Sequence, residues 1–237
     1  MSRKRRARPP TLIALAALAG AALLATVLLR LRLVPEPVAR AVAAATGKPA
    51  NLSPPLEPLS STAAKIVAGA KAQIGDLYDP RYVALAYPNG DVARGRGACT
   101  DVVVRALRHA GYDLQRLIHK DMKEHFAVYP KKWGLRRPDP HIDHRRVPNQ
   151  QVFFARHGRT LTKTVSSATR AQWQPGDIVT WKLDSGLDHT GVLSDRVGAD
   201  GVPLVIHNLS QCAEEDCLTR WKVTGHFRYP RGPAAGR

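Results

Sequence analysis

The sequence predicts an α+β domain, in which N-terminal helices pack on an antiparallel sheet, with one transmembrane helix before them. Three observations predict this class. An uncharged apolar segment lies near the N-terminus, a helical apolar pattern occupies the middle of the chain, and short strand patterns fill the last third. Because the helical patterns precede the strand patterns, helices and sheet are expected to be segregated along the chain.

The apolar segment covers residues 11–29 and contains no charged side chain. A helix of this length would span about 28 Å, close to the roughly 30 Å hydrocarbon core of a bilayer. The basic flank, residues 1–10, carries five Lys and Arg residues and is expected to stay in the cytoplasm. We therefore predict an uncleaved, single-pass signal-anchor over residues 11–32 in the cytoplasmic (inner) membrane. A cleaved signal peptide is the alternative, although no clear small-residue cleavage site follows the segment.

The rest of the chain divides into a linker, one domain and a short tail. Residues 33–60 are rich in proline and alanine, which is typical of a linker. One folded domain is expected over residues 61–230, on the periplasmic or cell-wall side of the membrane, with a disordered tail at 231–237. Within the domain, residues 113–170 are interpreted as a loop-rich insertion, because several prolines interrupt them.

The chain is strongly basic, with 36 Lys and Arg, 19 Asp and Glu and a formal net charge of +17. A basic surface favours anionic partners. We expect an exported domain to meet an acidic cell-wall polymer or an anionic lipid rather than nucleic acid. Nucleic-acid-binding proteins interleave aromatic and basic side chains, and this sequence lacks such stripes. The expected partners are peptidoglycan, as substrate, and the membrane, through the N-terminal helix. No nucleic-acid partner is expected.

Two helices are expected before the sheet. Residues 61–76 have helical spacing of apolar side chains, with Ser and Thr at the start to cap the helix. In residues 99–110 the apolar side chains fall on one helical face, and Gly111 follows as a stop signal. Cys99 is therefore expected in the first turn of a helix that faces the core.

Four strand patterns follow in the last third of the chain, joined by short connections rich in Gly and Asp. They cover residues 177–182, 189–195, 203–209 and 221–229. Such short connections are typical of an antiparallel meander. In a meander, His189 and His207 would lie side by side on adjacent strands.

The chain contains three cysteines, Cys99, Cys212 and Cys217. In an oxidising compartment, Cys212 and Cys217 are expected to form a disulfide. Cys99 is then left unpaired. It is either a reactive thiol or a small buried hydrophobe, and the cysteine count alone does not decide between them.

A thiol at a helix N-terminus is suited to nucleophilic chemistry. The helix dipole and the free N–H groups stabilise the thiolate and lower its pKa, and the same groups can hold an oxyanion. The cysteine also needs a base, usually a histidine, and the base needs an orienting partner. We expect a row of Cys99, His189 and His207, with the Cys99 helix packed on the face that carries both histidines. No cofactor is expected.

Four blocks of the sequence resemble the NlpC-type, papain-like cell-wall cysteine peptidases. These blocks are GACTDVVVRALRHAGYDL, WQPGDIVTW, DHTGVLSD and LVIHNLS. The chain looks still more like an uncharacterised bacterial family (YijF-type), on the blocks GACTDVV, IDHRRVPN, PGDIVTW, LVIHN and TGHFRYP. The resemblance implies a papain-like (NlpC-type) fold, with Cys99 as nucleophile, His189 as general base and His207 as the orienting third member. Asn208 is the alternative for the third role.

The insertion contains the stretch HIDHRR, in which Asp143, His144 and Arg145 are candidate binding residues. Its arginines would clamp a carboxylate or phosphate bidentately. A solvated basic loop with an internal Asp–Arg ion pair is the other interpretation. The spacing does not match a known zinc motif, so no metal site is expected.

Two classes of function are compatible with these residues. The first is an exported cysteine hydrolase, a peptidase or amidase that acts on peptide or amide bonds of the cell wall through Cys99, His189 and His207. The second is a non-catalytic, membrane-tethered module that binds an anionic wall polymer or lipid through the basic insertion. The enzyme is favoured because its three residues follow one another on a helix and two strands.

Overall fold

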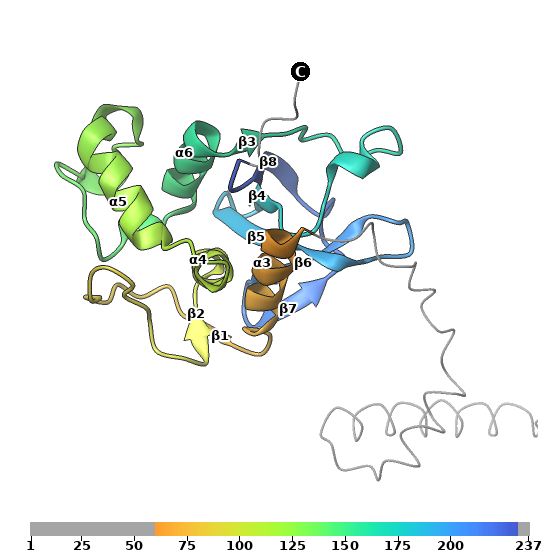
Figure 1. Ribbon diagram of the computed structural model, residues 1–237, viewed down its shortest axis with the longest axis horizontal. Helices are drawn as coiled ribbons and strands as arrows, with labels where there is room; N and C mark the ends of the chain where they lie inside the picture. The colour runs from red at the N-terminus through yellow and green to blue at the C-terminus, as the bar shows by residue number, and fades with distance from the viewer. Residues whose placement is uncertain (1–59, 232–237) are drawn as a thin grey trace, which may run out of the picture. The chain divides into compact units, whose positions relative to one another are not determined.

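A six-stranded antiparallel sheet forms the centre of the described part of the chain, residues 60–231 of the computed structural model (Figure 1). Its strands are β3 Arg159–Thr160, β4 Ile178–Lys182, β5 Asp188–Val197, β6 Pro203–Asn208, β7 Cys212–Glu215 and β8 Lys222–Arg228. Strands β4 to β7 form a meander, and β8 returns to pair with β4 on its other side. The strand patterns do not reveal β3 and β7, because their sequences lack alternating apolar and polar residues.

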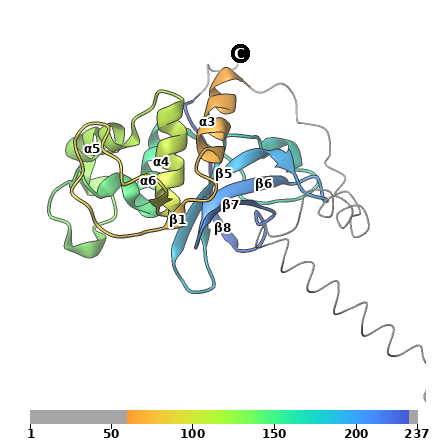
Figure 2. The same ribbon diagram turned by 90° about the horizontal axis from the view of Figure 1, so that it is seen from below.

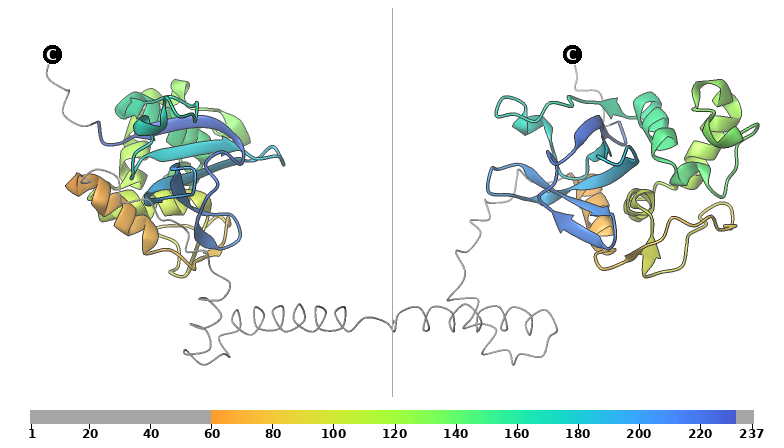
Figure 3. Two further views of the ribbon diagram at one scale, coloured as in Figure 1. Left: turned by 90° about the vertical axis from the view of Figure 1, so that its right-hand side faces the viewer. Right: turned by 180° about the vertical axis from the view of Figure 1, so that it is seen from behind.

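Helices cover one face of this sheet. In the described residues the α-helices are α3 Ser61–Lys71, α4 Cys99–His109, α5 Leu114–His125 and α6 Val147–His157. Figure 2 shows α3 and α4 next to each other against the sheet. Helices α5 and α6 lie on the side of the molecule away from β6 and β7 (Figures 1 and 3). A parallel pair of short strands, β1 Leu77–Tyr78 and β2 Arg96–Gly97, leads into α4.

The two faces of the sheet belong to two separate apolar cores. Side chains alternate in direction along a strand, so Val192 and Leu193 in β5 point to opposite faces. The helix face, which includes Val192, packs against α3, α4 and α6, and α5 joins the same core by packing on α4 and α6. The tryptophan face, which includes Leu193, packs around Trp173 and Trp181. A side chain of the central strands therefore belongs to one core or to the other.

The segment 113–170 is more helical than the sequence analysis predicts. It contains α5 and α6, and both contribute to the helix-face core. The core side chains from these helices are Leu114, Ile118, Met122, Phe153 and Phe154. The prolines concealed α6, because Pro148 lies in its first turn, where a missing N–H group costs no hydrogen bond.

The predicted signal-anchor at 11–32 lies outside the described residues, as do the basic flank at 1–10 and nearly all of the predicted linker and tail. Within residues 60–231, no helix is both long enough and apolar enough to cross a membrane. The fold prediction is corrected on this point: the described structure consists of helices and an antiparallel sheet, without a transmembrane element.

The predicted disulfide is also wrong, because Cys212 and Cys217 are free, buried thiols. Cys212 begins β7 and packs in the core of the helix face, whereas Cys217 packs in the core of the tryptophan face. The sheet therefore lies between the two side chains. Their short separation along the chain does not bring the sulfur atoms together.

We expect three free thiols per chain when the unreduced protein is unfolded in guanidinium chloride, because no cysteine pair is bridged. A chromogenic thiol reagent measures this count, with fully reduced protein as the control. A count of one in the unreduced sample would instead demonstrate the disulfide.

Candidate functional site

Cys99 is the first residue of α4 and is 6% exposed. The residue before it, Ala98, occupies the N-cap position and has no side-chain oxygen with which to cap the helix. Asp101, at position N3, supplies the other half of a capping box, because its Oδ2 accepts a hydrogen bond from the Ala98 N–H at 2.6 Å. This carboxylate therefore fixes the backbone on both sides of Cys99.

Arg145 holds the Asp101 carboxylate in turn. Its Nε and Nη2 donate to the two carboxylate oxygens at 2.8 and 2.9 Å, and the two side chains are only 2% and 3% exposed. Its Nη1 donates to the carbonyl of Arg81 at 2.8 Å. Arg145 thus clamps a carboxylate bidentately, as its residue type suggests. The carboxylate, however, belongs to α4 and not to a ligand.

Asp143 and His144 are also buried, at 1% and 2% exposure. Asp143 accepts a hydrogen bond from Arg146, and the carbonyl of His144 accepts one from Gln150 at 2.9 Å. Burial, and then the charge of Arg145, lowers the pKa of His144 to about 3. The HIDHRR stretch is therefore neither a binding loop nor a solvated one. It is a buried connection, and the binding-module alternative loses its proposed residues.

Burial dominates the ionisation of Cys99. It raises the pKa of the thiol to about 12, and the Asp101 carboxylate adds to this rise, while the N–H groups of Thr190, Thr100 and Cys99 oppose it. The helix N-terminus therefore does not produce a thiolate here, contrary to the expectation from the sequence. The thiol is protonated at neutral pH, and its use as a nucleophile requires a base.

His189 and His207 lie side by side, as the meander predicts. Nε2 of His189 and Nδ1 of His207 are 2.9 Å apart, and each residue is 2% exposed. Burial, and then the neighbouring ring of His207, lowers the pKa of His189 to about 3. Burial also lowers the pKa of His207, against the opposing effect of the Glu215 carboxylate. Both rings are therefore neutral at pH 7, and one donates a hydrogen bond to the other.

Tryptophan side chains enclose this histidine pair. The ring of Trp181 lies nearly parallel to that of His189, with centroids 5.8 Å apart and an interplanar angle of 24°. Trp221 meets both histidine rings edge-on. His189 is an even number of residues from Leu193 in β5, so the pair lies on the tryptophan face.

Cys99 approaches β5 from the helix face. Its thiol lies near the N–H group of Thr190, the residue that follows His189, and this N–H group lowers the pKa of the thiol. Among the hydrogen bonds of residues 60–231, none joins this thiol to either histidine ring. The predicted row of Cys99, His189 and His207 stays a prediction, because the thiol meets the backbone of β5 beside His189 and not the imidazole ring. The structure joins the two histidines and brings Cys99 to the adjoining peptide.

Asn208 and Tyr78 complete the surroundings of Cys99. Nδ2 of Asn208 donates to the carbonyl of Gly97 at 3.0 Å, so Asn208 positions the chain that leads into Cys99. Tyr78 lies opposite Gly97 in the short parallel sheet. Burial raises the pKa of Tyr78, and the nearby Cys99 and Asp101 groups raise it further. The sequence gives no signal for Tyr78, because β1 and β2 have two residues each.

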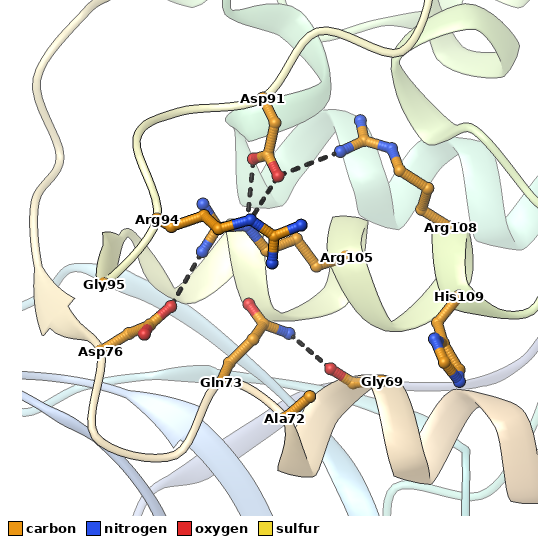
Figure 4. Close-up of a pocket in the computed structure, with 10 residues that line it drawn as sticks. All are labelled: Gly69, Ala72, Gln73, Asp76, Asp91, Arg94, Gly95, Arg105, Arg108 and His109. Atoms are coloured by element: carbon orange, nitrogen blue, oxygen red, sulfur yellow. Dashed lines mark hydrogen bonds and ion pairs between the residues drawn. The ribbon is translucent and has the colours of Figure 1, made fainter.

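A pocket of about 460 Å³ lies between α3, α4 and the loop before β2 (Figure 4). Arg105 pairs with Asp76 and Asp91 across it, and Arg108 also pairs with Asp91. These carboxylates neutralise both arginines. None of the candidate residues lines the pocket. Its ion pairs instead fix the loop before β2 to α4.

Residues 67–229 match the model of a protein family described as a domain of unknown function, DUF1287. One relative, from Escherichia coli strain K12, carries the name "Uncharacterized protein YijF". It is 53% identical over 173 residues, which cover 72% of this chain and 83% of the relative. The resemblance to a YijF-type family is thereby confirmed. No solved structure matches the chain.

The expectation of a papain-like (NlpC-type) fold is corrected, because the solved structures give it no support. The blocks that suggested it correspond to α4, β4, β5 and β6. A helix followed by antiparallel strands occurs in many unrelated α+β domains. The fold is therefore described by its own elements, α3 to α6 and the six-stranded sheet.

Loss of the Asp101–Arg145 ion pair should strongly destabilise the protein. In Asp101→Asn, the Arg145 guanidinium stays buried without its counter-charge, so we expect the free energy of unfolding to fall by about 3–5 kcal/mol. Urea denaturation followed by circular dichroism measures this. The control Lys182→Ala breaks a partly exposed pair with Asp188 and should cost less than about 1 kcal/mol. Equal losses in both variants would contradict the structural role.

Acid should destabilise the protein through its buried histidines. His144 and His189 have folded-state pKa values of about 3, whereas an unfolded histidine titrates near pH 6.5. Between these values the unfolded chain binds more protons, so stability is full above about pH 6.5 and declines as the pH falls towards 3. Each histidine should contribute a loss of about 2 kcal/mol at pH 5. Urea unfolding at pH 7 and pH 5 measures this loss in the free energy of unfolding. The loss should be smaller in His144→Gln than in the wild type, and an equal loss in both would contradict the prediction.

Proposed function

The chain belongs to the DUF1287 family, and from its own residues we propose that it is an exported cysteine hydrolase that cleaves peptide or amide bonds, with Cys99 as nucleophile. The observation that carries the proposal is the position of this thiol. It lies at the start of α4, against the N–H of Thr190 and one residue from the hydrogen-bonded His189. The relative's name states no activity, and the geometry of this chain alone supports the proposal.

His189 is the base in this proposal, which requires its ring to reach the thiol at the start of β5, beside the peptide that joins residues 189 and 190. Its Nε2 is engaged with His207, so Nδ1 is the ring nitrogen left for the thiol. Among the described residues, Nε2 of His207 is a buried polar atom without a hydrogen-bond partner. Nδ1 of His189 is not such an atom. In the active tautomer, His189 donates its Nε2 proton to Nδ1 of His207 and keeps Nδ1 as an acceptor. His207 is then a positioning residue, because it selects that tautomer.

The proposed reaction needs only water as a second substrate. Nδ1 of His189 takes the proton of the Cys99 thiol while the sulfur attacks the carbonyl carbon. The C–N bond then breaks, the nitrogen leaves with the proton from His189, and a thioester remains. Water gives a proton to His189 and attacks the thioester, which releases the carboxylic acid and returns the thiol. Because burial keeps both groups neutral, the first proton transfer must accompany formation of the C–S bond.

Backbone N–H groups supply the stabilisation that the intermediate needs. The N–H groups of Cys99, Thr100 and Thr190 lie near the thiol and lower its pKa. A carbonyl oxygen held by such donors gains negative charge in the tetrahedral intermediate, at a site of low dielectric constant. Tyr78 is 39% exposed and lies near Cys99. Its hydroxyl is therefore placed to contact a bound substrate from the solvent side.

Charge supports cell-wall peptides as the substrate class. Residues 51–237 carry 27 Lys and Arg but only 18 Asp and Glu. A basic domain attracts acidic polymers, and the peptides of peptidoglycan carry free carboxylates. We therefore place the amide or peptide bonds of peptidoglycan first among the substrates to be assayed.

Substitution of Cys99 tests this function. Cys99→Ala should release no peptide from purified peptidoglycan, and His189→Ala should reduce release by about 10²- to 10⁴-fold, because it removes the base. Mass spectrometry of the soluble products measures both. An electrophilic thiol probe applied to the native protein should label Cys99, and His189→Ala should suppress this labelling.

The matched control is Cys212→Ala, which removes another buried thiol, on β7, and should hydrolyse like the wild type. Circular dichroism checks that each variant is folded. Hydrolysis that continues unchanged in Cys99→Ala would overturn the proposal, and so would a wild-type protein that cleaves neither peptidoglycan nor its isolated peptides.

A further inference from the structure

The second ring nitrogen of His207 faces a carboxylate and a thiol. Donor atoms of His207, Glu215 and Cys217 all lie within 4.8 Å of one another. We propose that these three side chains bind a zinc ion. The cluster is separate from the HIDHRR stretch, and the spacing of its residues along the chain follows no known zinc motif.

Strand pairing brings the three residues together. In the β6–β7 pair, Val205 lies opposite Glu215 and His207 lies opposite Ala213. Val205 and His207 are two residues apart, so Glu215 and His207 project from the same face as diagonal neighbours. Cys217 follows two residues later and is buried in the core of the tryptophan face.

An unpartnered nitrogen points to a missing ligand at this cluster. Nε2 of His207 is buried and has no hydrogen-bond partner in the described residues, and His207 as a whole is 2% exposed. The nearest carboxylate oxygen, Oε2 of Glu215, is 3.6 Å away, which is too long for a hydrogen bond. A buried polar atom without a partner costs free energy. A cation held between this nitrogen and the carboxylate would remove that cost.

The donor set selects zinc among common cations. Imidazole nitrogen, carboxylate oxygen and thiolate sulfur are all zinc ligands, whereas Ca²⁺ and Mg²⁺ prefer oxygen alone. Three protein ligands leave the fourth tetrahedral position for water. His189 completes the arrangement, because it hydrogen-bonds the other ring nitrogen of His207, as groups behind metal-binding histidines usually do.

The charges at the cluster balance when zinc binds. Burial raises the pKa of the Cys217 thiol to about 12, so without metal the thiol is protonated at pH 7. Zinc displaces that proton into solvent and forms the Zn–S bond. The thiolate and the Glu215 carboxylate then neutralise the two positive charges. Arg220 donates to Oε2 of Glu215 at 3.0 Å, which leaves the other carboxylate oxygen for the metal.

Zinc at this cluster would also change the base of the proposed hydrolase, a consequence that rests on the proposed function. A neutral His207 that binds zinc through Nε2 carries its proton on Nδ1 and donates it to Nε2 of His189. His189 then carries its own proton on Nδ1 and accepts none from Cys99. The metal would thus switch the hydrolase off by fixing the opposite tautomer.

The binding test uses the full-length chain freed of metal by chelation, with Zn²⁺ and Co²⁺ as probes. We expect one Zn²⁺ per chain in equilibrium dialysis and a thiolate-to-metal charge-transfer absorption with Co²⁺. Cys217→Ser and Glu215→Gln should each lose stoichiometric binding. His189→Gln changes no ligand and should weaken zinc affinity by about 10- to 100-fold. The Glu215 side chain is 39% exposed, so this substitution is compatible with folding, which circular dichroism verifies.

Cys99→Ser and Cys212→Ser are the matched controls, because each removes a buried thiol outside the cluster. Both should keep one zinc ion per chain and the cobalt absorption. The site would be overturned by retained binding in Cys217→Ser and Glu215→Gln, by loss of binding in Cys212→Ser, or by a wild-type chain that binds no zinc at micromolar concentrations.

The link to the hydrolase has its own readout. One equivalent of Zn²⁺ should lower probe labelling of Cys99 at least about 10-fold in the wild type, and should leave labelling unchanged in Cys217→Ser. Unchanged labelling in a zinc-bound wild type would overturn the link and leave the metal site standing. A metal-free protein whose Cys99 neither labels nor supports hydrolysis would overturn the proposed function and the link, while the binding data would still decide the site.

Discussion

The start of α4 depends on one buried ion pair. The Asp101 carboxylate accepts hydrogen bonds from the Ala98 N–H and from two nitrogens of Arg145, and Arg145 also reaches the carbonyl of Arg81. Two charges removed from water are tolerated only when their hydrogen bonds are satisfied in this way. One carboxylate thus joins the helix N-terminus, the loop before it and the segment before α6. The position of Cys99 follows from that junction.

Strand β5 brings the thiol and the histidine pair to adjoining residues. The histidine pair belongs to the tryptophan face, while Cys99 meets the same strand at Thr190 from the helix face. Burial holds the thiol and both rings in their neutral forms. The chemistry proposed for this site therefore relies on hydrogen bonds and tautomers within neutral groups, and not on a resting thiolate–imidazolium pair.

Local sequence patterns were sufficient for elements that bury a recognisable face. Apolar periodicity and a glycine stop predicted the helix that begins at Cys99, and strand order predicted that His189 and His207 are neighbours. The face of each side chain was harder to predict. DHTGVLSD lies in a strand that is buried on both sides, so its pattern does not distinguish residue 189 from residue 190.

Residues placed by distant contacts gave no local signal. Arg145 was identified as a carboxylate clamp from its type, but its partner Asp101 is 44 residues away. The spacing of Cys212 and Cys217 suggested a bridge, yet spacing does not report that a sheet lies between two side chains. The proposed zinc ligands likewise come together through strand register, which motif spacing does not encode.

The contact between Asn208 and Gly97 spans 111 residues and has a consequence for the order of folding. Contacts of such separation form late, because closing a long loop costs chain entropy before any contact compensates for it. During synthesis, α4 leaves the ribosome before β5 and β6 exist. Until then Cys99 is an ordinary accessible thiol, without Thr190 or Asn208 beside it. Strands β5 and β6, which are made after the helix that carries the cysteine, therefore create the environment of the thiol.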